Sequence, residues 1–464
     1  MRMSLKEKHL KAIEEKDFLQ KECEKLEIKI LDDDTGSFWH KKEYIDFMKK
    51  EAKRLDNKEK KDSLYGLNFG VKDLFCIDSM RTTAGSKILE NFKSPYTSTL
   101  VQTLQDKDGL IAGKLAMDEF AMGSYSNTSF YGRVSLPFDK SRTAGGSSGG
   151  SAAALPILDF TLGSDTGGSV RLPASFCGYV GYKPSYGVFS RFGMISYASS
   201  LDQAGLLTHS VEDLDYLMKQ DIVVQDVRDR TCLGKFDYVN DVRMDKVGYF
   251  PEILNGSLDS CVKKSYEDIL SKIPKDKLVA LSLSTLKYAT QIYYIIACSE
   301  AASNLARYQG VYFGKDIPHN LGGSYWEQVA QYRSEYFGVE VQKRIMLGSY
   351  ITSSENFSTV YEKAVGLRKL LKKEFEEVFE KVDTLVLPVA PFTSPSWDVI
   401  DSMTTDQIYM ADYMTVPFSL AGIPAISMPL YKDKQGLPIG MQFVGKQYKD
   451  GELISKCLKL EKEI

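Results

Sequence analysis

Histidine is scarce in this chain, with four copies among 464 residues. His9, His40, His209 and His319 all lie away from the carboxylate-rich and the glycine- and serine-rich segments. Histidine is the side chain most often used as a general base. The low count does not exclude histidine-based catalysis, but nothing in the neighbouring sequence supports it.

Paired or clustered cysteines are also missing. The seven cysteines are odd in number and scattered, and no two have the CxxC spacing: they are Cys23, Cys76, Cys177, Cys232, Cys261, Cys298 and Cys457. Small disulfide frameworks and zinc sites have regular cysteine spacings. We therefore expect free, mostly buried thiols in a reducing compartment, and no metal site.

The chain lacks long apolar runs and an excess of positive charge. The longest apolar candidates, Ile292–Ala297 and Leu385–Pro391, are far shorter than a membrane span, so no membrane association is expected. Lys and Arg number 59 against 62 Asp and Glu, which gives a net charge of −3. A protein that binds nucleic acid unaided is normally basic. If RNA is involved, a partner chain must hold most of it.

The order of segments predicts an α/β fold. At roughly 150 residues per domain the length suggests about three domains. Residues 1–62 are rich in lysine and glutamate with apolar residues at helical spacing, and their acidic residues argue against an intact mitochondrial presequence. From Tyr65 to Thr208 short apolar runs alternate with helical stretches, and residues 211–380 are more charged and helical. Strand-like sequence resumes at 383–388 and 415–445.

Sheet segments therefore lie on both sides of the helical middle. This order favours one core over separate modules. We predict an N-terminal helical segment at 1–62 and a single core at 63–464, with a helical insertion around 211–380. The core is expected to hold a central mixed β-sheet flanked by helices on both faces.

Two glycine- and serine-rich segments are the most informative motifs, Ala144–Ala154 (AGGSSGGSAAA) and Gly163–Arg171 (GSDTGGSVR). One interpretation is a pair of flexible turns. A phosphate-binding loop is a second, but neither GK[ST] nor GxGxxG is present. The third is nucleophilic catalysis, in which glycines let backbone N–H groups converge on an oxyanion.

The third interpretation assigns roles to particular residues. If Ser169 attacks a carbonyl, the N–H groups of Thr166, Gly167 and Gly168 can bind the oxyanion that forms. With no histidine nearby, the base is expected to be a lysine, which must be buried to be neutral. Lys72 ends the apolar run Leu67–Val71 and is the candidate. A lone lysine at a strand end is more often a solvated surface group.

Five ordered segments resemble the amidase signature family: Gly70–Asp73 (GVKD), Thr82–Ser86 (TTAGS), Met117–Ser124 (MDEFAMGS), Gly145–Ala153 and Gly163–Arg171. The resemblance implies that Ser169 is the nucleophile, that Ser147 after a cis peptide is the bridging serine, and that Lys72 is the base. Ser147 and Ser169 are 22 positions apart, two fewer than the family usually shows. The shortening lies in the connection 155–160, so we expect an intact site in a divergent member.

Two acidic groups are expected to have structural roles. Asp165 should organise the Gly168 turn through local side-chain-to-backbone hydrogen bonds. Asp118 and Glu119 are adjacent and do not face a common substrate, so a capping or salt-bridge role is expected for them.

Three further segments resemble the branch of this family that works in tRNA-dependent amidotransferases: Tyr293–Gly314, Arg344–Gly348 and Tyr413–Pro429. That resemblance implies hydrolysis of glutamine, with Arg344 binding its carboxylate, Asp412 its ammonium, and Tyr293 a further polar group. Met122, Gly123 and Ser124 are expected near the substrate.

The same resemblance implies partners. Ammonia would pass to a B-type partner subunit, which holds ATP and Mg and amidates Glu-tRNA(Gln), beside a small third subunit or its fungal replacement. No cofactor is expected in this chain itself. The alternatives are a free-standing amidase of another carboxamide and a catalytically inert scaffold. The short serine spacing and the lysine- and tyrosine-rich composition favour the mitochondrial matrix over the bacterial cytoplasm.

Overall fold

A computed structural model describes residues 2–317 and 322–463 of the chain. A single ten-stranded mixed sheet runs through these residues, in the order β2-β1-β3-β5-β4-β9-β10-β8-β6-β7. The strands are β1 (Asn68–Lys72), β2 (Leu110–Leu115), β3 (Phe160–Ser164), β4 (Val180–Lys183), β5 (Ala204–Thr208), β6 (Val247–Tyr249), β7 (Leu278–Ala280), β8 (Thr384–Pro388), β9 (Ala425–Lys432) and β10 (Pro438–Val444). The predicted α/β fold with a mixed sheet is confirmed.

The strands at the two ends of the sheet pair in parallel, and the strands between them pair antiparallel. β2, β1 and β3 are parallel neighbours, the pairs from β3 to β8 are antiparallel, and β8, β6 and β7 are parallel again. Every residue of β1 to β5 is buried, so both faces of these strands are covered. Parallel strands are normally covered in this way by helices on each face.

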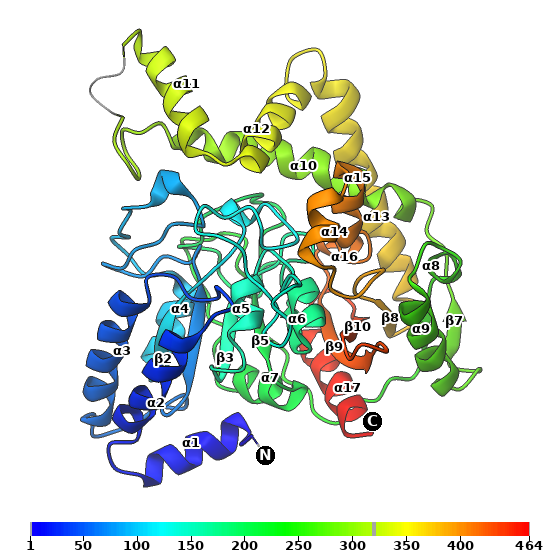
Figure 1. Ribbon diagram of the computed structural model, residues 1–464. Helices are drawn as coiled ribbons and strands as arrows, with labels where there is room; N and C mark the ends of the chain where they lie inside the picture. Colours follow the sequence, from blue (N-terminus) through cyan, green and yellow to red (C-terminus); the bar gives the residue numbers. More distant parts are fainter. Residues whose placement is uncertain (1, 318–321, 464) are drawn as a thin grey trace.

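Helices cover both faces of the sheet (Figure 1). They include α4 (Thr99–Asp106), α6 (Arg171–Cys177), α7 (Val211–Met218), α9 (Ser260–Lys272) and α17 (Asp450–Glu463). A side chain at Gly181 of β4 would touch Ala174 of α6, whereas the next residue, Tyr182, donates a hydrogen bond to Asp450 of α17. Neighbouring strand residues point to opposite faces, so α6 and α17 lie on opposite sides of the sheet.

Three N-terminal helices pack on the core: α3 (Lys41–Asp56) lies against β2, α2 (Phe18–Asp32) against α3, and α1 (Leu5–Glu14) against α7. A capping box at Ser4 starts α1. Apolar residues of α2 and α3 form a second hydrophobic cluster with Leu110 and Ala112 of β2. These helices are therefore packed onto the core, and the division at residue 62 remains a prediction about sequence organisation.

The helical middle of the chain is more varied than its sequence predicts. Residues 211–380 contain α10 (Ala289–Asn304), α11 (Tyr325–Tyr336), α12 (Val339–Ile351) and α13 (Glu362–Val378), but also β6 and β7 at one edge of the sheet. These two strands have three residues each, too few for a periodic pattern to stand out. Likewise, a short helix, α16 (Val416–Ala421), precedes β9 where strand-like sequence was expected.

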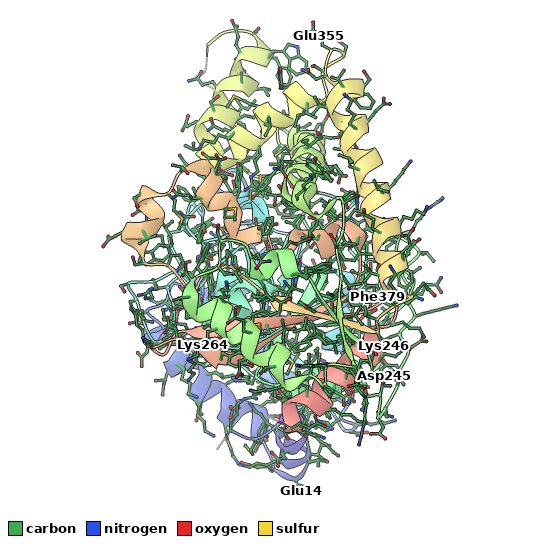
Figure 2. All side chains as sticks on the ribbon, turned by 90° about the vertical axis from the view of Figure 1, so that its right-hand side faces the viewer. Glu14, Asp245, Lys246, Lys264, Glu355 and Phe379 are labelled. Atoms are coloured by element: carbon green, nitrogen blue, oxygen red, sulfur yellow. The ribbon has the colours of Figure 1, made fainter. Side chains whose placement is uncertain are left out.

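Helices α10 to α13 form a lobe above the sheet in Figure 1. In the turned view of Figure 2, Glu355, in the turn after α12, and Glu14, at the end of α1, mark opposite ends of the molecule. Five of the seven cysteines are buried, and all are free, as predicted. Among the residues described, none of the helices is both long and apolar enough to cross a bilayer.

We predict that Lys8 anchors α1 to the core. Its Nζ lies 2.7 Å from Asp159 Oδ2, and the two side chains are 10% exposed each. Lys8→Ala leaves that buried carboxylate without its cation, so the free energy of unfolding should fall by about 3 kcal/mol. Urea denaturation measures the change. Lys25→Ala is the control, since Lys25 forms an exposed pair with Glu22, and equal losses in the two variants would contradict the prediction.

Candidate active site

A buried lysine stands at the centre of the candidate site. Lys72 ends β1 and is 0% exposed. Its Nζ lies 2.7 Å from Ser147 Oγ, 2.8 Å from Ser148 Oγ and 2.9 Å from Ser164 Oγ. Because β1 and β3 run parallel, Lys72 and Ser164 end at the same edge of the sheet. Burial lowers the pKa of Lys72 to about 7, so the amine can accept a proton near neutral pH.

Ser147 sits in the loop before α5 (Gly149–Ala153), directly after a cis peptide bond from Gly146. The implied cis geometry is therefore present. A side chain at Gly146 would come within 2.1 Å of Asp118 Oδ2, and the Ser147 carbonyl accepts a hydrogen bond from the Asp118 N–H. These contacts leave room only for glycine before Ser147 and fix its loop against the segment at Asp118.

Ser169 lies between β3 and α6 and is 8% exposed. Its carbonyl accepts a hydrogen bond from the Ser148 N–H at 3.1 Å, which joins the two serine loops. No described residue bonds to the Ser169 hydroxyl. Nor do the N–H groups of Thr166, Gly167, Gly168 and Ser169 donate to an acceptor in the described ranges. The loop thus offers a free hydroxyl beside several free amides, as an oxyanion site requires.

Asp165 and Arg171 hold this loop in place, and neither is exposed. The Asp165 carboxylate accepts hydrogen bonds from the N–H groups of Val170 and Arg171, so the expected local bonding is confirmed. Arg171 adds two bonds from Nε and Nη2. Burial alone would raise the pKa of Asp165, but Arg171 outweighs it and lowers that pKa. This partner was not predicted from the sequence, although Arg171 closes the same motif.

Glycine is needed at two positions within the loop of residues 166–169. Gly168 has φ of +149°, and a side chain there would lie 2.2 Å from Thr415 Oγ1. A side chain at Gly167 would lie 2.8 Å from the hydroxyl of Tyr293. Tyr293, on α10, therefore covers the loop, and the structure brings this expected substrate contact close to the candidate oxyanion amides.

Arg344 is buried on α12, and its positive charge is held by three neighbours. Its Nη1 donates to the Tyr197 hydroxyl and its Nε to Glu340, each at 2.8 Å. The guanidinium also lies 5.2 Å from the ring centre of Tyr294. Tyr197 carried no signal in the sequence, and Tyr294 lies in the segment Tyr293–Gly314 but was not singled out there.

Asp412 lies at the hydroxyl end of Tyr294, at the end of η6 (Met410–Asp412). Its carboxylate accepts hydrogen bonds from Ser124 Oγ at 2.9 Å and from the Tyr294 hydroxyl at 3.1 Å. Burial raises the pKa of Asp412 to about 6. One cation and one anion thus contact a single tyrosine, an arrangement that suits a zwitterionic ligand.

The expected contacts of Met122, Gly123 and Ser124 with a substrate stay a prediction, and the structure shows how these three residues are held. Met122 is fully buried, and its carbonyl accepts a hydrogen bond from Thr128. A side chain at Gly123 would collide with Asp118, which accepts hydrogen bonds from the N–H groups of residues 126–128. Only Ser124 of the three is tied to Asp412. Met122 and Gly123 shape the loop.

Asp118 does not cap the short helix that follows it; its carboxylate binds loop amides instead, and Glu119 has a related role. The Glu119 carboxylate accepts hydrogen bonds from Ser86 Oγ and from the N–H of Gly338, the residue that begins α12. Burial raises its pKa to about 7. Neither carboxylate forms an ion pair in the described part of the chain, so the salt-bridge alternative is wrong.

The family comparison matches this architecture. The model of the Amidase family matches residues 29–454. The A-type subunit of glutamyl-tRNA(Gln) amidotransferase from Pelagibacter ubique is 41% identical over 430 residues, covering 89% of this chain and 86% of that protein. The corresponding protein from Psychrobacter sp. is 43% identical over 419 residues, covering 84% and 81% of the two chains.

Solved structures give the same picture. The crystal structure of the A-type subunit of glutamyl-tRNA(Gln) amidotransferase from Thermotoga maritima has a TM-score of 0.80 at 32% identity, covering 99% of this chain and 94% of that one. The crystal structure of an amidase has a TM-score of 0.80 at 29% identity and covers both chains completely.

We predict that covalent labelling of Ser169 depends on a neutral Lys72. The rate of reaction with a fluorophosphonate should rise with pH through about 7, as Lys72 loses its proton, and Lys72→Met should abolish it. Labelling rates by mass spectrometry measure this.

The control for that experiment is Lys183→Met. Lys183 is also buried with a pKa lowered by burial to about 7, but its Nζ bonds to the Pro184 carbonyl instead of a serine. Labelling that is flat between roughly pH 5 and 9, or equally lost in both variants, would contradict the assignment.

Proposed function

The chain belongs to the amidase family, and on that premise we propose that it is the glutamine-hydrolysing subunit of a glutamyl-tRNA(Gln) amidotransferase. The observation that carries the proposal is the pair of opposite charges, Arg344 and Asp412, which both contact Tyr294, one over its ring and the other at its hydroxyl. Free glutamine has an α-carboxylate and an α-ammonium group, and needs one partner of each sign.

Glutamine is held at both ends. Arg344 binds the α-carboxylate, and the ionised carboxylate of Asp412 binds the α-ammonium together with Ser124. Tyr293 packs over the Ser169 loop and confines the side chain of the substrate. The carboxamide is then directed at Ser169, and its oxygen at the free amides of Thr166 to Ser169.

Ser169 Oγ attacks the carboxamide carbon, and its proton passes through the Ser147 hydroxyl to the neutral amine of Lys72. The backbone amides stabilise the negative oxygen of the tetrahedral intermediate. As the C–N bond breaks, the proton returns through Ser147 to the leaving nitrogen, and ammonia departs. Water then attacks the glutamyl ester of Ser169 through the same relay, and glutamate is released.

Ammonia passes to a B-type partner subunit, which binds ATP, Mg and Glu-tRNA(Gln), with a small third subunit or its fungal replacement completing the complex. The net charge of −3 supports this division, because the RNA must be bound elsewhere. The mitochondrial matrix favoured by the composition stays a prediction. The bacterial cytoplasm, the alternative, agrees with the sources of the relatives named above.

We predict that Ser169→Ala lowers glutamine-dependent amidation by the complex by more than about 10⁴-fold, while added ammonium salt still supports it. The nucleophile is lost, but the partner that consumes ammonia is intact. Formation of Gln-tRNA(Gln) from each nitrogen donor measures the effect.

Ser175→Ala is the matched control for that variant. Ser175 is a buried serine of α6 whose hydroxyl accepts a hydrogen bond from the Gly440 N–H, away from the relay. Loss of ammonia-driven amidation in Ser169→Ala, but not in Ser175→Ala, would contradict the assigned role.

We predict that Arg344→Gln raises the KM for glutamine at least about tenfold, because a charged hydrogen bond to the carboxylate is lost. Hydrolysis of propionamide, which has no carboxylate, should change less than about threefold. Steady-state kinetics with both amides measure this. The control is Arg333→Gln, since Arg333 donates to the backbone carbonyls of residues 305 and 308 and lies over the ring of Phe337. Equal losses on both amides would favour the free-standing amidase.

A further inference from the structure

Asp202 joins the two ends of the candidate substrate site. It lies two residues before β5 and is 5% exposed. Its Oδ1 accepts a hydrogen bond from Thr166 Oγ1 at 2.7 Å, and its Oδ2 accepts from the N–H groups of Tyr197 and Ala198 at 2.8 and 2.9 Å. One carboxylate thus bonds both to the loop of oxyanion amides and to the segment that carries Tyr197.

Tyr197 connects Asp202 to Arg344. Its hydroxyl accepts a hydrogen bond from Arg344 Nη1, and its carbonyl accepts one from Asn304 Nδ2 of α10 at 3.1 Å. The tyrosine is 1% exposed and its ring lies 5.6 Å from the guanidinium carbon. With its N–H on Asp202, Tyr197 is fixed at three points, so it has little freedom to let Arg344 move.

The chain of bonds therefore runs from Thr166 through Asp202 and Tyr197 to Arg344. The first residue belongs to the amides that face the scissile carboxamide, and the last binds the α-carboxylate. Each link is buried, and buried hydrogen bonds are costly to break. The separation between the two ends of the site is set by this chain.

We propose that Asp202 is a positioning residue that fixes the distance between the oxyanion loop and Arg344, and so makes the site select glutamine over the shorter asparagine. The inference rests on the proposed function. Asparagine lacks one methylene, so with Arg344 holding its carboxylate, its carboxamide stops short of Ser169. A misplacement of about 1 Å can cost on the order of 100-fold in rate.

The test compares kcat/KM for glutamine and for asparagine in the assembled complex. Assays at roughly pH 8 keep Asp202 ionised, since burial raises its pKa to about 6. Asp202→Ala should raise the KM for glutamine and lower the glutamine-to-asparagine ratio by about tenfold, the discrimination that one methylene can supply. Asp202→Asn keeps an acceptor for the two backbone N–H groups and should hold the ratio within about threefold of the unmodified value.

Two further variants keep the test valid if Asp202→Ala fails to fold. Thr166→Val and Tyr197→Phe each break one link, and each should lower the same ratio. Because the links act in series, the double variant Asp202→Ala with Tyr197→Phe should have the same glutamine-to-asparagine ratio as Asp202→Ala alone, within about twofold.

Asp450→Ala is the matched control. Asp450 is equally buried and accepts hydrogen bonds from the Tyr182 hydroxyl and from the N–H and hydroxyl of Ser185, on the far side of the sheet. It should change stability without changing the ratio.

The inference is overturned if Asp202→Ala and Tyr197→Phe lower kcat/KM equally for glutamine and asparagine. It is also overturned if the unmodified complex hydrolyses both amino acids equally well. Failure of the proposed function is a different result, in which the unmodified complex hydrolyses neither amino acid amide.

Discussion

The burial of one amine is the constraint on which this site depends. Lys72 is useful as a base only when neutral, and burial lowers its pKa to about 7. Nearby carboxylates would cancel that effect if they paired with it. Asp118 and Asp165 are close enough to raise the pKa partly, but each is engaged elsewhere, Asp118 with backbone amides and Asp165 with Arg171. Serine hydroxyls satisfy the lysine without keeping it charged.

The sheet supplies the geometry for this arrangement. Parallel strands β1 and β3 bring Lys72 and Ser164 to one edge, and the loops that follow β3 and precede α5 carry Ser169 and Ser147 over it. The ligand-binding charges come from elsewhere, on α12 and η6. The 197–203 loop spans the gap between these two parts, so it couples the position of Arg344 to that of the Ser169 loop.

The sequence predicted much of this, for reasons that can be named. The short apolar runs of 65–208 and the helical sequence of 211–380 agree with the observed strands and helices, whereas β6 and β7 are too short to be distinguished. Lys72 alone reads as an ordinary strand-end lysine, and its role followed only from the ordered family motifs. Ser148 and Ser164 lie inside those motifs but were passed over, since nothing marks which serine points toward Lys72.

Other parts of the site had no sequence signal at all. Tyr197 meets Arg344 across 147 positions, and Asp202 is linked to Arg344 through Tyr197, which periodicity and local motifs do not encode. Met122 and Gly123 lie in a family motif and pack close to Asp118 and Thr128, and their contacts with a substrate stay a prediction. A family motif indicates which segment lies near the site, but the direction of each side chain in that segment depends on the tertiary fold.

The most direct test of the central claim is an NMR titration of the Lys72 amine. With ¹⁵N-labelled lysine and Lys72→Met to assign the signal, the Nζ shift reports protonation, and exposed Lys264 on α9 serves as the reference (Figure 2). We expect a midpoint at about 7 for Lys72. A midpoint near the ordinary value of 10.5 would contradict the role of Lys72 as base, because the amine would then be charged during catalysis.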